Sequence, residues 1–245
     1  MVTHSTLEYK DDEGRVYAGE LYVPSSLGSA KRPGVLIFPA FRGVTQLEME
    51  RARILAEEHG YVALVADIYG KGVRFTEIPT ALTVIRPLMS DRIGKMKPRL
   101  EASLNALKAV PTVDDQRLAA FGFCLGGLCS LDMARHHFDG FRAIISFHGT
   151  LTPIEGLALD PIIGTSIQVH HGDADSHIPK EQVDGFHEEM RARQADFVFV
   201  SHGKAMHSFT DPESGSIAPS GVGYDANADK RSWRDTLALL TEVFA

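Results

Sequence analysis

The stretch "RLAAFGFCLGGLCSLDMARHH" (residues 117–137) joins an apolar run to a helical pattern through a glycine-rich turn. The run before the turn is typical of an interior strand, and a helix is expected from Cys124 to about His137. Gly122 and Gly126 lie two residues on either side of Cys124, and they leave room for a strained central residue that is exposed above the sheet. We interpret this turn as a nucleophile elbow with cysteine in the place of serine.

The chemistry of the turn supports a reactive sulfur at Cys124. A helix N-terminus supplies a positive dipole end and free N–H groups, which favour a thiolate and an oxyanion formed beside it. An ordinary buried cysteine at a tight strand–helix turn fits the same motif, so the motif alone leaves both interpretations open. Cys129, the other cysteine, falls inside the predicted helix and is expected to be buried and inert.

Strand-like and helix-like segments alternate on both sides of this turn. Helices are expected at 45–60, 124–137, 180–193 and 231–244, and strands at 15–23, 34–40, 61–70, 117–123, 141–149, 165–172 and 196–203. Most of these strands are continuous apolar runs, which suit interior parallel strands. The pattern predicts an α/β fold, a mostly parallel sheet with helices on both faces. Between residues 71 and 97, Pro79 and Pro87 interrupt the helical pattern and predict a broken helix.

Composition limits the class of protein. A chain of 245 residues with 44% apolar residues is expected to form a single domain over residues 1–245. The net charge of −7 argues against a general affinity for nucleic acid or anionic membranes. No signal-peptide pattern or transmembrane run is found, and two cysteines cannot form a disulfide framework, so a soluble, cytoplasmic protein is expected. Composition carries no information on the oligomeric state.

Polar loops follow two later strands, at "VHHGDADSHIP" (169–179) and "VSHGKAMHSF" (200–209). In such sheets ligands bind beyond the carboxyl ends of the strands, so side chains from these loops can meet Cys124. We choose Asp175 as the acid and His207 as the base, because the chain order nucleophile, acid, base is that of α/β-hydrolases. Taken singly, such an Asp usually caps a turn, and such a His usually lies at the surface or in the core.

The sequence resembles the dienelactone hydrolase family of α/β-hydrolases over nearly its whole length. The resemblance is carried by "GFCLGG", "HGDADSHIP", "MHSF" and the ending "GYDANADKRSWRDTLALLTEVF". It implies that Cys124 attacks a small ester or lactone and forms a cysteinyl acyl-enzyme, while His207 moves the proton and Asp175 holds the imidazole. It also implies an oxyanion hole formed by the backbone N–H groups of Leu125 and Phe41. The same donors are expected for any nucleophile elbow.

Two positions depart from the family pattern. Ala40 stands where well-known members carry a Glu, so Cys124 is expected to rest as a thiolate paired with His207 unless Glu48 or Glu50 substitutes. Asp211 stands where those members carry an Arg that binds the substrate carboxylate, which argues against an anionic lactone.

Three further residues are candidates for substrate contact. Arg42 and Arg86 are candidates for anion binding, with a solvated surface position as the alternative for each. Tyr69 either borders the cleft or packs in the core.

We expect no cofactor and no metal. The dinucleotide and P-loop patterns are absent, and His170 and His171 point to opposite faces of one strand, so they cannot chelate together. Trp233 is expected to pack against the domain. Two alternatives to an esterase stay open: a thioesterase or acyl-transfer enzyme on the same fold, and a non-catalytic protein that binds a ligand.

Overall fold

The computed structural model describes residues 2–25, 30–217 and 221–245. Over these residues, eight strands are ordered β1-β2-β4-β3-β5-β6-β7-β8 in one mostly parallel sheet, and helices pack against it. The predicted fold class is confirmed. The chain divides into two compact units, up to Ala120 and from Phe121 onward, so the single domain over residues 1–245 stays a prediction.

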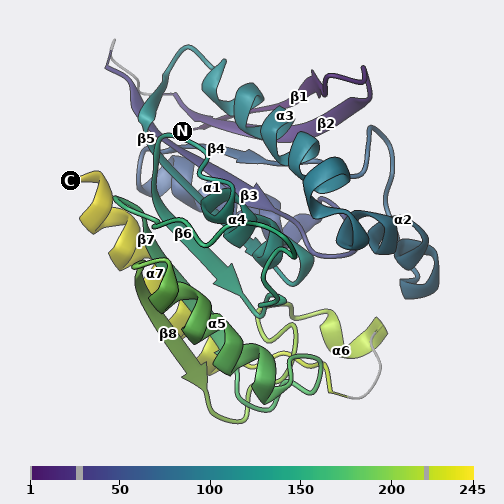
Figure 1. The fold of residues 1–245 in the computed structure, drawn as a ribbon. Coiled ribbons are helices and arrows are strands. Elements are labelled where there is room, and N and C mark those ends of the chain that lie inside the picture. Colours follow the sequence, from purple (N-terminus) through teal and green to yellow (C-terminus); the bar gives the residue numbers. More distant parts are fainter. Residues whose placement is uncertain (1, 26–29, 218–220) are drawn as a thin grey trace. The chain divides into compact units, whose positions relative to one another are not determined.

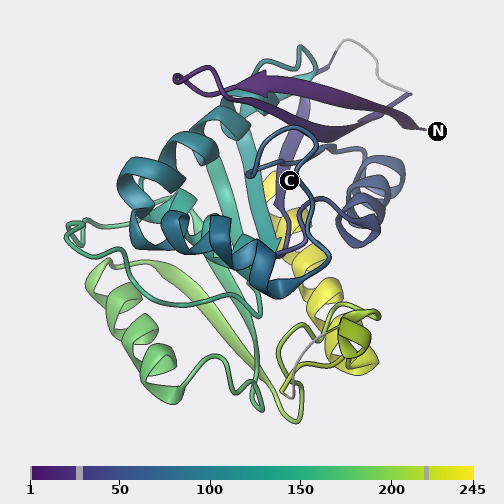
Figure 2. The same ribbon diagram turned by 90° about the vertical axis from the view of Figure 1, so that its right-hand side faces the viewer.

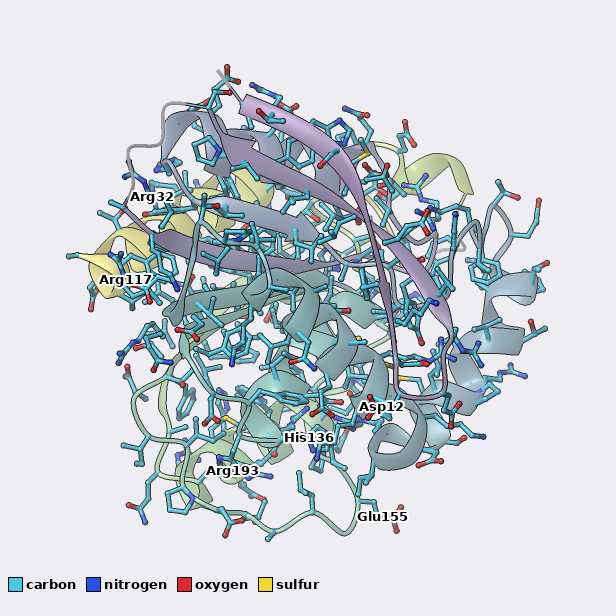
Figure 3. The ribbon with its side chains drawn as sticks, turned by 90° about the horizontal axis from the view of Figure 1, so that it is seen from above. Asp12, Arg32, Arg117, His136, Glu155 and Arg193 are labelled. Atoms are coloured by element: carbon cyan, nitrogen blue, oxygen red, sulfur yellow. The ribbon has the colours of Figure 1, made fainter. Side chains whose placement is uncertain are left out.

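The first unit is built on four strands and the start of a fifth. They are β1 (Val2–Lys10), β2 (Val16–Pro24), β3 (Arg32–Phe38), β4 (Val62–Val65) and the beginning of β5 (Val113–Phe123). β1 and β2 form an antiparallel hairpin, β2 is antiparallel to β4, and β3 is parallel to β4. The side chain of Arg117 on β5 donates to the Lys31 carbonyl at 3.3 Å, beside Arg32 at the start of β3 (Figure 3).

Helices cover both faces of this first group of strands. α1 (Gln46–Glu58) lies on one side and α3 (Lys97–Lys108) on the other (Figure 2). Thr45 begins α1 through a capping box with Glu48. Each helix therefore buries one side of the hydrophobic strands, which explains why β3 and β4 are buried along nearly their whole length.

The segment between β4 and α3 is a broken helix, as predicted, but the break does not fall at either proline. Pro79 lies in the first turn of α2 (Ile78–Ser90), where its missing N–H leaves no hydrogen bond unmade. Pro87 lies inside α2 without ending it. The break comes at Asp91 (φ −140°, ψ 72°), whose carboxylate accepts the N–H of Gly94 at 2.7 Å and begins the π-helix η1 (Arg92–Met96). A local side-chain hydrogen bond, rather than either proline, interrupts the helix.

In the second unit, several parallel strands end at the same edge of the sheet. The end of β5 is followed by α4 (Leu125–Arg135), β6 (Phe141–Phe147), β7 (Ser166–Gly172), α5 (Lys180–Ala192), β8 (Asp196–His202), α6 (Ser214–Ile217) and α7 (Ala226–Phe244). β6, β7 and β8 are parallel, so the loops after them emerge together. α5 and α7 lie on opposite sides of β7 and β8 (Figures 1 and 2).

Two buried groups stabilise this unit. Phe121, Phe123 and Phe147 pack ring against ring, and Trp233 contacts Phe121 with ring centroids 5.8 Å apart, in line with its predicted packing role. Among the described residues, no helix is long and apolar enough to cross a membrane.

The second buried group is an ion network between α4 and α5. The Arg135 guanidinium donates to both oxygens of Glu189, at 3.0 and 2.7 Å. Arg193 (Figure 3) donates to the same carboxylate at 3.0 Å, and Asp132 accepts from Arg135 at 3.2 Å. Because these charges are buried, each depends on its partner, and the network fixes the two helices against each other.

Candidate active site

The turn after β5 has the backbone geometry of a nucleophile elbow. Cys124 has φ 54° and ψ −113°, a strained conformation that costs about 1–3 kcal/mol and needs support from its surroundings. A Cβ at Gly122 would lie 2.2 Å from the Gly126 carbonyl oxygen, so the close approach of strand and helix requires glycine there. The Cys124 N–H donates to the Phe147 carbonyl at 3.0 Å, which ties the elbow to β6. The chain therefore passes from strand to helix through a strained residue at Cys124, as the sequence predicts, while the role of this residue as a nucleophile stays a prediction.

Asp175 and His207 come to Cys124 from the loops after β7 and β8. The Nε2 atom of His207 lies 3.1 Å from the Cys124 sulfur, and its Nδ1 donates to Asp175 Oδ2 at 2.8 Å. The other oxygen of Asp175 accepts the N–H of His177 at 2.8 Å, so the carboxylate is held on both sides. The structure brings together the three side chains that the sequence selects.

A short bridge holds the loop that carries His207. Its N–H donates to the Gly221 carbonyl at 3.1 Å, and its carbonyl accepts the N–H of Gly223 at 3.0 Å. Both backbone groups of the imidazole-bearing residue are therefore fixed by the segment that precedes α7. This anchoring limits the movement of the ring away from the sulfur.

The electrostatics favour a charged pair. Burial raises the pKa of the Cys124 thiol, but the His207 imidazole and the hydrogen bond from the Leu125 N–H lower it further, so the net direction is down. Burial lowers the pKa of His207, yet the sulfur and Asp175 outweigh burial and raise it to about 10. Both shifts favour a thiolate paired with an imidazolium, the form suited to nucleophilic attack and proton donation.

Two other residues considered in the sequence, Leu125 and Cys129, lie in this unit. Leu125 is the first residue of α4, and its N–H contacts the sulfur, where an oxyanion donor is expected. Cys129 is buried inside α4, as predicted for an inert thiol.

Four predicted residues lie in the first unit. Phe41 and Arg42 are half-buried in the turn after β3, and the Arg42 carbonyl accepts the N–H of Phe75 at 3.1 Å. Tyr69 is buried, with its ring edge-on to Phe75 at 5.1 Å, and Arg86 is exposed on α2. The roles of Phe41, Arg42, Tyr69 and Arg86 toward the substrate stay predictions.

The acidic residues proposed as substitutes for the missing Glu have local partners. Glu48 is buried, and its carboxylate accepts the N–H groups of Thr45 at 2.9 Å and Ala40 at 3.4 Å. Glu50 pairs with Arg53 at 2.8 Å. Glu48 therefore caps α1 and binds the turn that contains Ala40, whereas Glu50 forms an ion pair within α1.

The structure adds two residues that sequence reasoning missed. The His148 imidazole packs against His207 with ring centroids 5.3 Å apart, and its Nε2 lies 2.8 Å from the Thr210 hydroxyl. A histidine at the end of a buried strand, directly before Gly149, was the available signal.

His170 and His171 contact different neighbours. His170 contacts His202, whereas the His171 ring packs against Phe199. Over the described ranges, no cluster of three or more potential ligands is arranged to hold a metal ion.

The profile of the dienelactone hydrolase family matches residues 18–244. The chain belongs to the dienelactone hydrolase family. This family member is a hydrolase that acts on ester or lactone bonds.

Several relatives align with this family member over most of its length. A dienelactone hydrolase-like promiscuous phosphotriesterase from metagenomic libraries is 35% identical, with a TM-score of 0.92 over 100% of this chain and 99% of that one. An uncharacterized Caenorhabditis elegans protein is 73% identical over 158 residues, 64% of this chain and all of that protein. A Bradyrhizobium protein named "Probable 2-oxo-3-(5-oxofuran-2-ylidene)propanoate lactonase" is 24% identical over 229 residues, 89% of this chain and 87% of that protein.

Proposed function

We propose that this dienelactone hydrolase family member cleaves a small ester or lactone through a cysteinyl acyl-enzyme on Cys124. The observation that supports it is the continuous contact from sulfur to imidazole to carboxylate, at 3.1 and 2.8 Å, on a strained elbow. A structural cysteine needs neither the strain nor an imidazole at this distance. The same contact argues against a non-catalytic binding protein, in which nothing would keep the three groups aligned.

In the acylation step, the Cys124 thiolate attacks the carbonyl carbon and forms a C–S bond. The carbonyl oxygen becomes an oxyanion, which the N–H group of Leu125 stabilises. When the intermediate collapses, the C–O bond breaks, and His207 gives its Nε2 proton to the leaving alcohol oxygen. For a lactone, the alcohol stays attached to the acyl group. Asp175 keeps the imidazole oriented throughout and stabilises its positive charge.

Deacylation uses the imidazole in the opposite direction. Neutral His207 takes a proton from water, and the oxygen of that water attacks the thioester carbonyl. The C–S bond then breaks, the carboxylic acid leaves, and the thiolate–imidazolium pair of Cys124 and His207 is restored. One water is consumed for each bond cleaved.

The charge near the base bears on the substrate. Asp211 lies four residues beyond His207, and its carboxylate accepts the N–H of Glu213 at 2.9 Å. An acidic group here repels a substrate carboxylate, whereas members with an arginine at this place attract one. We therefore propose a substrate that is neutral at this position.

Phosphate triesters are a second candidate class. The 35% identical solved relative is a promiscuous phosphotriesterase, and it aligns over the whole of this chain. A thiolate that attacks a carbonyl carbon can also attack the phosphorus of a neutral triester and displace an alcohol. Thioesters are a further acyl substrate that the same mechanism accommodates.

The test is turnover of a neutral panel by the native protein, Cys124→Ala and Cys124→Ser. The panel contains 4-nitrophenyl acetate, small enol-lactones, a thioester and a phosphate triester. The expected result is hydrolysis that disappears in Cys124→Ala, with the rank of substrates defining the class. Hydrolysis that persists in Cys124→Ala, or no hydrolysis by the native protein, would overturn the proposal.

A further inference from the structure

A second imidazole lies beside the base. His148 is the first residue after β6, its side chain is buried, and its backbone has φ 40°, a conformation that non-glycine residues seldom adopt. Its ring stands edge-on to that of His207, with centroids 5.3 Å apart. The proposed mechanism uses only one imidazole, so the second requires an explanation.

The contacts of His148 assign a role to each ring nitrogen. Nδ1 lies 3.2 Å from the backbone nitrogen of Cys124, and because that nitrogen is a donor, Nδ1 accepts. A neutral imidazole has one donor and one acceptor, so Nε2 carries the proton and donates to the Thr210 hydroxyl at 2.8 Å. Burial and the nearby charge of His207 hold the pKa of His148 well below its usual range. Both nitrogens are occupied, and His148 therefore does not compete with His207 for the proton.

Thr210 lies on the loop that carries the base, three residues after His207, and it is buried. The hydrogen bonds therefore run from the Cys124 N–H through His148 to Thr210. This path joins the backbone of the nucleophile to the loop of the base, separately from the contact between sulfur and Nε2. It also satisfies the Cys124 N–H on the strained elbow, together with the Phe147 carbonyl.

We propose that His148 and Thr210 are positioning residues, which fix the position of the Cys124 turn relative to the loop that carries His207. The proposal rests on the proposed function of the triad. The path keeps sulfur and Nε2 within hydrogen-bond distance, so that the thiolate–imidazolium pair forms in the resting enzyme. The packing of His148 against Phe209 alone, with centroids 5.1 Å apart, does not require these polar contacts.

Two amide substitutions separate the two ends of the path. In His148→Asn, the amide oxygen takes the place of Nδ1 and accepts the Cys124 N–H, but the side chain is too short for Thr210. In His148→Gln, the amide reaches Thr210 but leaves Cys124 without this acceptor. Each is expected to lower kcat about tenfold, the effect of one hydrogen bond, with little change in KM.

Thr210→Val is the near-isosteric variant that also removes the contact to His148, and Thr210→Ser retains the hydroxyl. Thr210→Val is expected to match the amide variants, and Thr210→Ser to restore kcat to within about twofold of the native value. Thr165→Val is the matched control: it removes a similar hydrogen bond, from Thr165 to the Phe141 carbonyl at 2.9 Å, near the other end of β6. It is expected to leave kcat unchanged.

The rate of Cys124 alkylation by iodoacetamide as a function of pH provides a readout that needs no substrate. The pH at which alkylation reaches half its maximal rate is expected to rise in three variants: His148→Asn, His148→Gln and Thr210→Val. In Thr210→Ser and Thr165→Val this pH is expected to equal that of the native protein. Native alkylation profiles and native kcat in folded His148 and Thr210 variants would overturn the proposal. So would an equal change in Thr165→Val, or an effect confined to the melting temperature. Failure of the proposed function is distinct, because it appears as hydrolysis that persists in Cys124→Ala or as no hydrolysis by the native protein.

Discussion

Replacing Asp175 with asparagine removes one charge from the triad and leaves the size of the side chain almost unchanged. The carboxylate accepts from two donors, Nδ1 of His207 and the N–H of His177, each at 2.8 Å. An asparagine side chain offers one oxygen, which accepts, and one NH₂ group, which donates. The N–H of either His207 or His177 would therefore lie against the asparagine NH₂ group. Either His207 adopts the tautomer with its proton on Nε2, or the N–H of His177 loses its acceptor.

The size of the effect follows from the hydrogen bond that is lost. A bond to a charged group contributes about 1.5–3 kcal/mol, which corresponds to a fall in kcat/KM of about 10- to 150-fold. The same loss destabilises the imidazolium of His207, because the carboxylate favours the charged ring. Its pKa, raised to about 10 in the native protein, should therefore fall to about 8 or 9.

The assay is kcat/KM for 4-nitrophenyl acetate as a function of pH, in the native protein and in Asp175→Asn. The alkaline limb of the profile should move to lower pH in the variant. Asp173→Asn is the matched control, since Asp173 is exposed and its carboxylate accepts the Ser201 hydroxyl at 3.0 Å, outside the contact with His207. A kcat/KM for Asp175→Asn within about threefold of the native value, with an unmoved alkaline limb, would refute this account of Asp175.

The native pH profile should fall at both ends: the Cys124 thiolate is lost below its lowered pKa, and the His207 imidazolium is lost as pH rises through about 10. Activity that stays constant well beyond that alkaline limit contradicts the charged pair. Iodoacetamide should modify Cys124 long before Cys129, which is buried, and peptide mass mapping that finds equal labelling would argue against an activated thiol. Arg135→Leu should lower the free energy of unfolding by about 3 kcal/mol, because Glu189 loses two hydrogen bonds in a buried site. Urea unfolding measures this loss, and a change below about 1 kcal/mol would show that the network contributes little.

Burial explains which strands can be predicted from the sequence. The continuous apolar runs in β3 and β5 are buried, and both strands are predicted near their observed positions. β1 escapes prediction because it pairs only with β2 at the edge of the sheet, so most of its residues are exposed and carry no apolar pattern. Pro87 also led to a wrong position for the helix break. A proline inside a helix removes one backbone hydrogen bond, but α2 continues through Pro87 despite this loss.

The candidate site divides in a similar way. Cys124, Asp175 and His207 follow strands in the order that α/β-hydrolases use, so position and residue type together select them. His148 carries no such order, and its contact with Cys124 depends on two positive-φ turns that only the folded backbone reveals. The contacts of Glu48 also depend on the folded chain, because its carboxylate caps α1 and accepts the N–H of Ala40 at 3.4 Å, and its role as a substitute for the missing Glu stays a prediction.

The most direct test of the central claim is to trap the covalent intermediate. The native protein is mixed with 4-nitrophenyl acetate, quenched in acid during the burst, digested and analysed by mass spectrometry. We predict one acetyl group on the peptide that contains Cys124, at a level that rises as fast as nitrophenolate is released. Turnover without acetylation of Cys124, or acetylation at another residue with the same kinetics, would contradict a cysteinyl acyl-enzyme.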